Sequence, residues 1–199
     1  MVAGMSTPAD ARDRLVAAAQ EMFAAQGVGA TSPRQVLAAS GVGQGSLYHH
    51  FPTKHDLAAA AVGATVESAL TAARRDLEGT TPALDRVVAY LERPRDARAG
   101  GKIGRLTSDQ AVMDDDGLRD VVTAYFVRLL DVVAATLRET GLPDDAARDR
   151  AHAAVAIVQG GYVLARATGD PDAMRAAVRG FATLLTDRPD STDPTEETA

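Results

Sequence analysis

Alanine is the feature that most constrains the fold, because it supplies 40 of the 199 residues. It is the best intrinsic helix former, whereas the β-branched and aromatic runs that favour strands are few. Hydrophobic residues make up 46% of the chain, enough over this length to bury the core of one large or two small domains. The sequence therefore predicts an all-α protein.

Proline, glycine and capping residues divide the chain into about nine helices. Thr7-Pro8, Ser32-Pro33, Thr53 and Pro82 are start signals, because a hydroxyl can cap a helix and proline suits its first position. Gly27, Gly41 and Pro52 are stop signals. The predicted helices are 8–26, 33–40, 44–51, 54–78, one opening at Pro82, a short one over 105–113, a long one after Asp114–Asp116, 144–168, and a last one around 174–185. The segment 93–104, rich in Pro, Gly and Arg, is predicted to be a mobile loop.

Residues 32–51 have the pattern of a helix-turn-helix, two short helices joined by a glycine turn. Ser32 and Gln35 are spaced as a capping box, and Gly41 suits a left-handed turn. In such a motif the second helix enters the DNA major groove. Many helical hairpins share this spacing, so a hairpin that only packs remains an alternative.

The particular residues of this motif are more specific than its spacing. The stretch over about residues 9–60 resembles the N-terminal DNA-binding domain of the TetR family of transcriptional regulators, with one departure at Gly43, where serine is usual. The residues that carry the resemblance are Gly27, Ala30-Thr31-Ser32, Val36, Ala39, Gly41-Val42, Gly45-Ser46-Leu47-Tyr48-His49-His50-Phe51, Lys54 and Leu57. The resemblance implies a helix-turn-helix domain over 7–53 and a helical ligand-binding and dimerisation domain over 54–186, paired through its last two helices.

Several side chains of the motif have the chemistry of DNA contacts. Hydroxyls at a helix N-terminus can bind a phosphate, glutamine can bond adenine with two hydrogen bonds, and lysine supplies a point charge. Leu47 and Phe51 are assigned instead to the core. The predicted DNA-binding residues are Thr31, Ser32, Arg34, Gln44, Gly45, Ser46, Tyr48, His49 and Lys54.

The charge of residues 1–60 sums to zero, although the whole chain carries −6. We therefore predict that DNA affinity depends weakly on salt, with a log–log slope shallower than about −8. His49, His50 and His55 could suggest a metal cluster, but adjacent helical residues point in different directions. No metal and no cofactor is expected.

The helix over 144–168 is apolar on two sides, whereas a helix with one packing partner needs one apolar stripe. We predict that one side forms a homodimer interface with the last helix. The alternative is that both sides lie in one core. The predicted interface residues are Ala153, Ile157, Gly160, Leu164, Ala177, Val178 and Phe181.

The second side of the same helix is predicted to face a small-molecule site, a mostly apolar cavity with a few polar groups. For each single residue a plain core position remains the alternative. TetR relatives bind inducers in this region, and in some subgroups a cysteine there senses electrophiles. This chain has Gly101 at that position and no cysteine, so only reversible binding is expected. The predicted ligand-binding residues are Tyr90, Gln110, Tyr125, Phe126, Leu129, Gln159, Tyr162 and Arg166.

Together these features predict a homodimeric repressor that a small-molecule ligand releases from a palindromic double-stranded DNA operator. A regulator without ligand response, or an activator, is the alternative. An enzyme is not expected, because no nucleophile–base set or phosphate-binding glycine motif occurs. No apolar stretch reaches the roughly 18–20 residues of a membrane span, and a cytoplasmic location is expected. Residues 187–199, with a net charge of −4, are predicted to be a disordered acidic tail.

Overall fold

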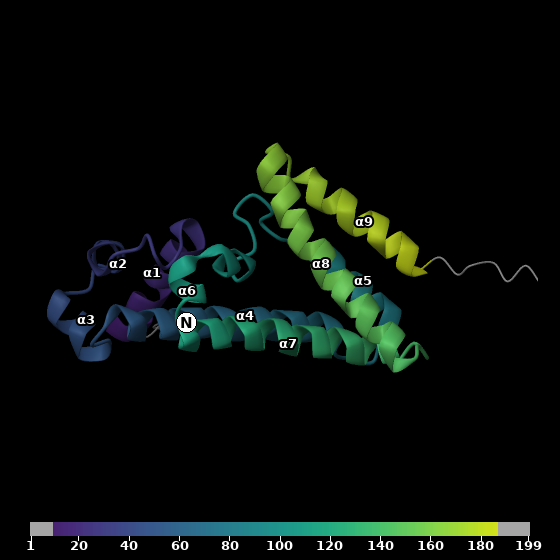
Figure 1. Cartoon of the computed structure of the whole chain (residues 1–199), viewed down its shortest axis with the longest axis horizontal. Helices are drawn as coiled ribbons and strands as arrows, with labels where there is room; N and C mark the ends of the chain where they lie inside the picture. Colours follow the sequence, from purple (N-terminus) through teal and green to yellow (C-terminus); the bar gives the residue numbers. More distant parts are fainter. Residues whose placement is uncertain (1–9, 187–199) are drawn as a thin grey trace, which may run out of the picture.

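The computed structural model describes residues 10–186, and the all-α prediction is confirmed for this part of the chain (Figure 1). It contains nine α-helices and one 3₁₀ helix, η1. The helices are α1 (Ala11–Gln26), α2 (Pro33–Ser40), α3 (Gln44–His50), α4 (Lys54–Leu77), α5 (Ala83–Glu92), η1 (Gly104–Ser108), α6 (Gln110–Met113), α7 (Asp116–Arg138), α8 (Asp144–Thr168) and α9 (Asp172–Thr186). The predicted start at Thr7-Pro8 and the predicted disordered tail lie outside the described residues.

Local capping chemistry sets the ends of α2 and α4. The Ser32 and Thr53 hydroxyls each accept the backbone N–H three residues on, and the side chains of Gln35 and Asp56 accept the N–H of the capping residue in return. Gly41 ends α2 in the left-handed conformation, with φ of 63°. These short-range contacts fix the turn before α3, as the sequence predicts.

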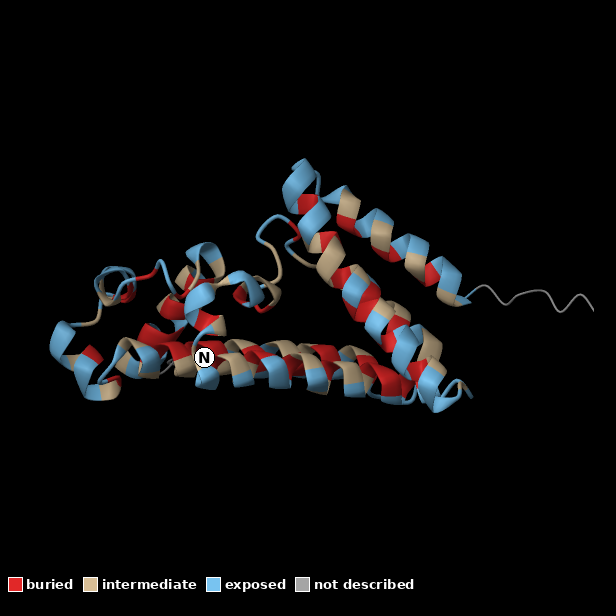
Figure 2. Ribbon diagram, viewed as in Figure 1, coloured by how far each residue is buried: buried red, intermediate tan, exposed pale blue. Residues whose placement is uncertain are grey.

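The first three helices pack into a small unit at one end of the elongated molecule (Figure 1). α1 contacts α2, α3 and α4. The buried side chains of this unit include Leu15, Phe23, Val36, Leu47 and Phe51. Figure 2 colours the buried residues along these helices red. Burying one large apolar side chain stabilises the fold by roughly 1.5–3 kcal/mol, and this burial is the main contribution that holds the unit together.

The remaining helices continue the same core along the molecule. α4 leaves the three-helix unit and runs beside α7, and α8 packs on α7 and carries α9 (Figure 1). Buried alanines let these helices approach closely, among them Ala61 and Ala73 on α4 and Ala151 and Ala154 on α8. Within the described residues, no helix combines the length and hydropathy needed to cross a bilayer.

The segment between α5 and α7 differs from the sequence prediction. Instead of one short helix over 105–113, η1 and α6 are separated at Asp109, whose Oδ1 accepts the N–H of Ala111 at 3.1 Å and so starts a new helix. The 93–104 loop is irregular, as predicted, but it is anchored: Ala97 and Ile103 are buried, and Arg95 donates to the carbonyls that end α5. The prediction of a mobile loop did not anticipate these tertiary contacts.

Candidate nucleic-acid interface and ligand cavity

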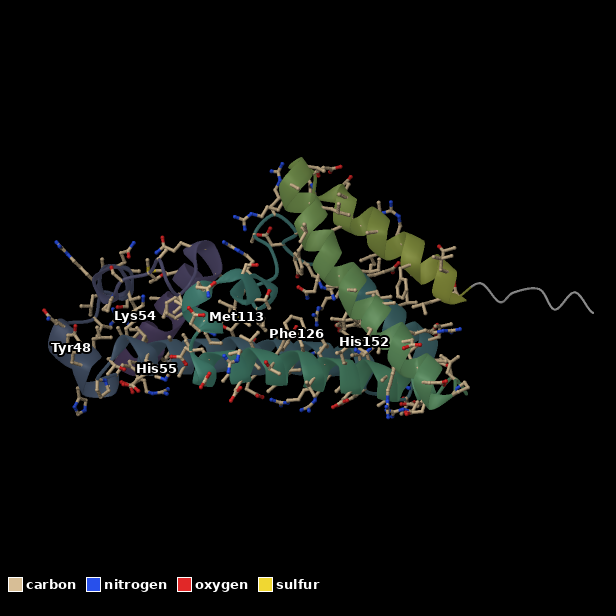
Figure 3. All side chains as sticks on the ribbon, viewed as in Figure 1. Tyr48, Lys54, His55, Met113, Phe126 and His152 are labelled. Carbon is tan, nitrogen blue, oxygen red and sulfur yellow. The ribbon has the colours of Figure 1, made fainter. Side chains whose placement is uncertain are left out.

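Helix α3 lies at the far end of the molecule and exposes its first turn (Figure 1). Gln44 and Gly45 are exposed, and a Cβ added to Gly45 would meet nothing within 4 Å. Leu47 is buried against the unit, whereas the Tyr48 side chain is 49% exposed and points away from it (Figure 3). One face of α3 therefore packs on the core, while the opposite face is free to enter a DNA groove.

Thr31 is not available for the phosphate contact that the sequence suggested. Its side chain is buried, and its hydroxyl donates to the Gly27 carbonyl at 2.6 Å and accepts from Gln26 Nε2 at 3.1 Å. The neighbouring Ser32 is exposed, but its hydroxyl and backbone N–H both bond to Gln35. Thr31 is thus a structural residue of the α1–α2 turn, and Ser32 is first a helix cap.

The other predicted DNA-binding residues lie on α3 or close to it, and they differ in exposure and in their contacts. Arg34 and His49 are exposed, and Ser46 is half-buried. Lys54 begins α4, and its Nζ donates to the Gly29 carbonyl at 3.3 Å (Figure 3). Sequence reasoning missed Arg14, which donates to the Ser40 carbonyl at 2.5 Å and holds the helix-turn-helix turn against α1.

A cavity of about 680 Å³ lies in the C-terminal part, a volume in the range of ordinary ligand sites. It is lined from α1, α4, α5, α7, α8 and the 93–104 loop. Four of the sequence-predicted ligand residues line it, namely Tyr90, Tyr125, Gln159 and Tyr162. Arg93 and Arg95 also line the cavity and were not predicted. The cluster of arginines in the 93–104 segment was the one signal in the sequence that could have indicated them.

The other four predicted ligand residues do not line this cavity. Phe126 and Arg166 line a neighbouring hollow of about 330 Å³, and Gln110 lines another of about 490 Å³ beside Asp109. Leu129 is buried in the core. The prediction was correct for α5, α7 and α8, but it included α6, which does not line the cavity, and it missed α1 and α4, which do.

Burial controls the ionisation of the cavity side chains. It raises the pKa of Tyr90, Tyr125 and Tyr162 above that of a free phenol, and it lowers the pKa of the Arg95 guanidinium. Arg93 and Arg95 stack on the Tyr90 ring, at 5.6 and 5.2 Å from its centroid, and Arg93 pairs with Asp76 at 3.0 Å. The cavity wall therefore combines three phenols with two arginines, one of which is paired with a carboxylate.

The predicted interface residues on α8 and α9 are partly or wholly exposed, with one exception. Ala153, Ile157 and Gly160 are half-buried, and the Leu164 side chain is 49% exposed. Ala177 and Phe181 on α9 are half-buried, but Val178 is buried inside the protomer and cannot contact a second copy. The exposed Val163 on α8 was missed.

His49, His50 and His55 do not form one metal-binding group in the described part of the chain. The His49 and His50 rings meet edge to face, whereas His55 Nδ1 lies 2.8 Å from Oδ2 of Asp115, the residue that caps α7. Among residues 10–186, no group of three metal-ligating side chains is placed to hold an ion.

Two family models match the chain. The model of bacterial regulatory proteins of the TetR family matches residues 15–61, and that of the C-terminal domain of LmrA/YxaF-like transcriptional regulators matches residues 77–180.

Relatives and solved structures agree with these matches. The chain is 26% identical over 162 residues to the HTH-type transcriptional regulator LmrA of Bacillus subtilis, covering 78% of this chain and 86% of that one. It is 25% identical over 173 residues to the uncharacterized regulator YxaF of the same species, covering 83% and 90%. A TetR regulator from Legionella pneumophila superimposes with a TM-score of 0.80 at 19% identity over 92% of this chain and 99% of that chain. The chain therefore belongs to the TetR family of helix-turn-helix transcriptional regulators, whose members bind DNA and act as dimers.

Proposed function

We propose that this regulator is a homodimeric repressor that leaves a palindromic operator when a small molecule enters the C-terminal cavity. The observation that supports the proposal most is the cavity of about 680 Å³, because Gly104 in its wall begins the segment 104–109. Asp109 at the end of that segment accepts a hydrogen bond from Val28 in the α1–α2 turn, so the cavity is linked to the DNA-binding unit. As a DNA-bound regulator it would act in the cytoplasm and without catalysis.

The exposed first turn of α3 is proposed to read base edges, with the rest of the unit bound to phosphates. The proposed DNA-binding domain spans residues 7–53, of which the structure describes 10–53, and the proposed ligand-binding and dimerisation domain spans residues 54–186. Gly45 lets the helix approach the groove closely, since nothing lies within 4 Å of its Cβ position. The proposed contacts are Ser32, Arg34, Gln44, Gly45, Ser46, Tyr48, His49 and Lys54.

The apolar face of α8 and α9 is proposed to pair with a second copy. Val163 and Leu164 are large apolar side chains left in water in the single chain, and burying them would favour association. Two-fold pairing would also present two α3 helices to two half-sites of a palindrome. The proposed interface residues are Ala153, Ile157, Gly160, Val163, Leu164, Ala177 and Phe181.

A continuous set of contacts joins the cavity to the DNA-binding unit. Gln159 Oε1 lies so close to Gly104 that a Cβ there would clash with it, and a Cβ on Gly101 would lie 3.0 Å from the Tyr162 ring. The next residue, Arg105, donates to the Ala24 and Ala25 carbonyls at the end of α1. A ligand that displaces Gln159 or Tyr162 would move this segment and shift the balance between two orientations of the DNA-binding unit.

Selection of binding sites from random duplex DNA tests the proposal. The wild type and the double variant Gln44→Ala/Tyr48→Ala would be selected in parallel at low salt, since both residues are exposed and their loss leaves the core intact. We expect a palindromic motif from the wild type and none from the variant. Absence of a motif from folded, dimeric wild type would overturn the proposal, and a motif that no cavity ligand weakens would leave a regulator without ligand response.

A further inference from the structure

We propose that the ligand of the C-terminal cavity is an aromatic carboxylic acid whose carboxylate pairs with Arg95. This inference rests on the proposed function, namely that a small molecule occupies the cavity. It adds the chemical class of that molecule and the side chain that recognises its charge.

Arg95 is a cation bonded to neutral groups. Nη1 donates to the carbonyls of Leu91 and Arg93 at 2.7 and 2.9 Å, and Nη2 donates to the Tyr90 carbonyl at 2.5 Å. A guanidinium has five N–H donors, so Nε–H and one Nη2–H remain. These belong to neighbouring nitrogens that a carboxylate can bind with two parallel hydrogen bonds.

Arg95 forms no salt bridge with a described residue, and Asp76, whose charge favours the Arg95 cation from a longer range, already pairs with Arg93. Arg93 beside it has Asp76 as its partner at 3.0 Å, but Arg95 is in no ion pair within residues 10–186. Glu21 and Asp96, the acidic residues that line the cavity, are both exposed to water. Burial lowers the pKa of Arg95, which shows that its surroundings disfavour the unpaired cation. An organic anion would supply the missing charge.

The body of the ligand is indicated by the rings around Arg95. Tyr90, Tyr125 and Tyr162 come from three different helices and line one cavity. Rings of this kind bind planar aromatic molecules through stacking and edge-to-face contacts. Their phenols can also donate hydrogen bonds to a carboxylate oxygen. A cationic ligand would instead meet Arg93 and Arg95 and be repelled.

Three probes with one ring system and different charges test the class of ligand. Binding of 2-naphthoate, 2-naphthamide and 2-naphthylmethylamine to the full-length wild type would be measured by calorimetry at pH 7.5 without DNA. We expect naphthoate to bind at least about tenfold more tightly than the amide, as the charge-assisted pair requires, and the amine not to bind. Equal binding of the amide, binding of the amine alone, or binding of none of the three would overturn the proposal.

Matched variants test the role of Arg95. Arg95→Gln should lose at least about tenfold in naphthoate affinity and Arg95→Lys should restore part of it, because lysine keeps the charge without the fork. Arg179→Gln is the control for the place of binding, because Arg179 lines a second groove that shares Arg93, Pro94 and Arg95 with the cavity but contains none of its tyrosines. Naphthoate bound in the cavity should bind this variant as it binds the wild type. Because Arg95 also bonds the end of α5, Tyr125→Phe is a second variant that removes only a hydroxyl, and it should weaken naphthoate severalfold. Wild-type affinity in folded Arg95→Gln, or in Tyr125→Phe if Arg95→Gln does not fold, would overturn the assignment.

The operator separates this inference from the function on which it rests. Naphthoate that binds through Arg95 but leaves the selected operator bound would support the ligand class and contradict ligand-released repression. Release of the operator by the amide or the amine would support ligand-released repression and overturn the ligand class.

Discussion

The Asp109 carboxylate accepts a hydrogen bond from the backbone N–H of Val28 at 2.5 Å, and the same oxygen accepts the N–H of Gly29 at 3.2 Å. These residues belong to the C-terminal part and to the α1–α2 turn. Arg105, four residues earlier, donates to carbonyls at the C-terminal end of α1, where a cation is favoured by the helix dipole. One short segment beside the cavity therefore holds both sides of the turn that leads to the helix-turn-helix.

Replacing Asp109 by Asn should loosen this attachment. Asn can still cap α6. Its amide oxygen is uncharged, however, and accepts the N–H groups of Val28 and Gly29 more weakly than a carboxylate does. We expect the free energy of unfolding to fall by about 1–2 kcal/mol and operator affinity to change, because a hydrogen bond to a charged group contributes about 1.5–3 kcal/mol and a neutral amide keeps part of that. Chemical denaturation and anisotropy measure the two effects. Asp114→Asn, at an exposed carboxylate that bonds only Gln110 among described residues, is the control, and equal effects of the two variants would contradict the role of Asp109.

Two glycines of the N-terminal unit should respond oppositely to alanine. Gly27 has a φ of 91°, and its added Cβ would lie 2.6 Å from Asp109 Oδ2, so Gly27→Ala should destabilise the protein. Gly45 is in α3 with open space around it, so Gly45→Ala should raise stability by up to about 1 kcal/mol. It should nevertheless weaken operator binding, because the methyl group would hold α3 away from the groove. Thermal melts and DNA titrations distinguish the two, and unchanged DNA affinity in Gly45→Ala would count against the groove assignment.

Arg86 is a buried cation with a structural role. It donates to the Leu77 carbonyl at 2.7 Å and to the Thr81 carbonyl at 2.9 Å, and it pairs with Glu139. Arg86→Ala removes the donor of the Thr81 carbonyl and leaves the Leu77 carbonyl only the Thr136 hydroxyl at 3.3 Å. It also opens a cavity, so we expect a loss of about 2–3 kcal/mol in the free energy of unfolding. The exposed Arg128, paired with Glu67, is the matched control, and Arg128→Ala should change stability little. Comparable losses in both variants would refute this distinction.

Stability should fall in alkaline solution. The folded-state pKa values of Tyr90, Tyr125 and Tyr162 are raised by burial, so the stabilisation is complete below the pKa of an unfolded tyrosine, about 10, and is lost as pH rises above it. Phenolate absorbance should show three of the four tyrosines ionising at higher pH in the folded than in the denatured protein. Tyr125→Phe should flatten the loss of stability between pH 9 and 11. A titration curve that is the same before and after unfolding would contradict the burial of these phenols.

A charge placed on the proposed interface should separate the dimer. Leu164→Glu puts a carboxylate where two copies would bury apolar surface, so sedimentation should show a monomer with weakened operator binding. Val127, an exposed apolar residue on α7, provides the control, and Val127→Glu should remain dimeric. If Leu164→Glu sediments as the wild type does, the pairing face lies elsewhere.

Short-range chemistry made most of the fold predictable. The Ser32 and Thr53 caps, the left-handed Gly41 and the 144–168 helix depend on residues close in sequence, and each is observed as predicted. Site residues depend instead on tertiary contacts. Thr31 is removed from the DNA face by a bond to Gly27, and Val178 is turned into the core although it is adjacent to the half-buried Ala177.

The anchoring of the 93–104 loop was also beyond sequence reasoning. Its arginines bond to backbone carbonyls and stack on Tyr90, and neither partner produces a periodic pattern in the sequence. For the same reason the sequence did not indicate that Arg95 faces the cavity.

The most direct test of the account is the affinity of the selected operator for wild type and for Gln44→Ala/Tyr48→Ala, measured by anisotropy at one salt concentration with full and half-site duplexes. The account predicts two protomers per full duplex, weak binding of the half-site, and a loss of at least about 100-fold in the variant, since several base contacts worth about 1–3 kcal/mol each would be removed. Variant binding equal to that of the wild type, or a half-site bound as tightly as the palindrome, would contradict a dimeric reader that uses α3.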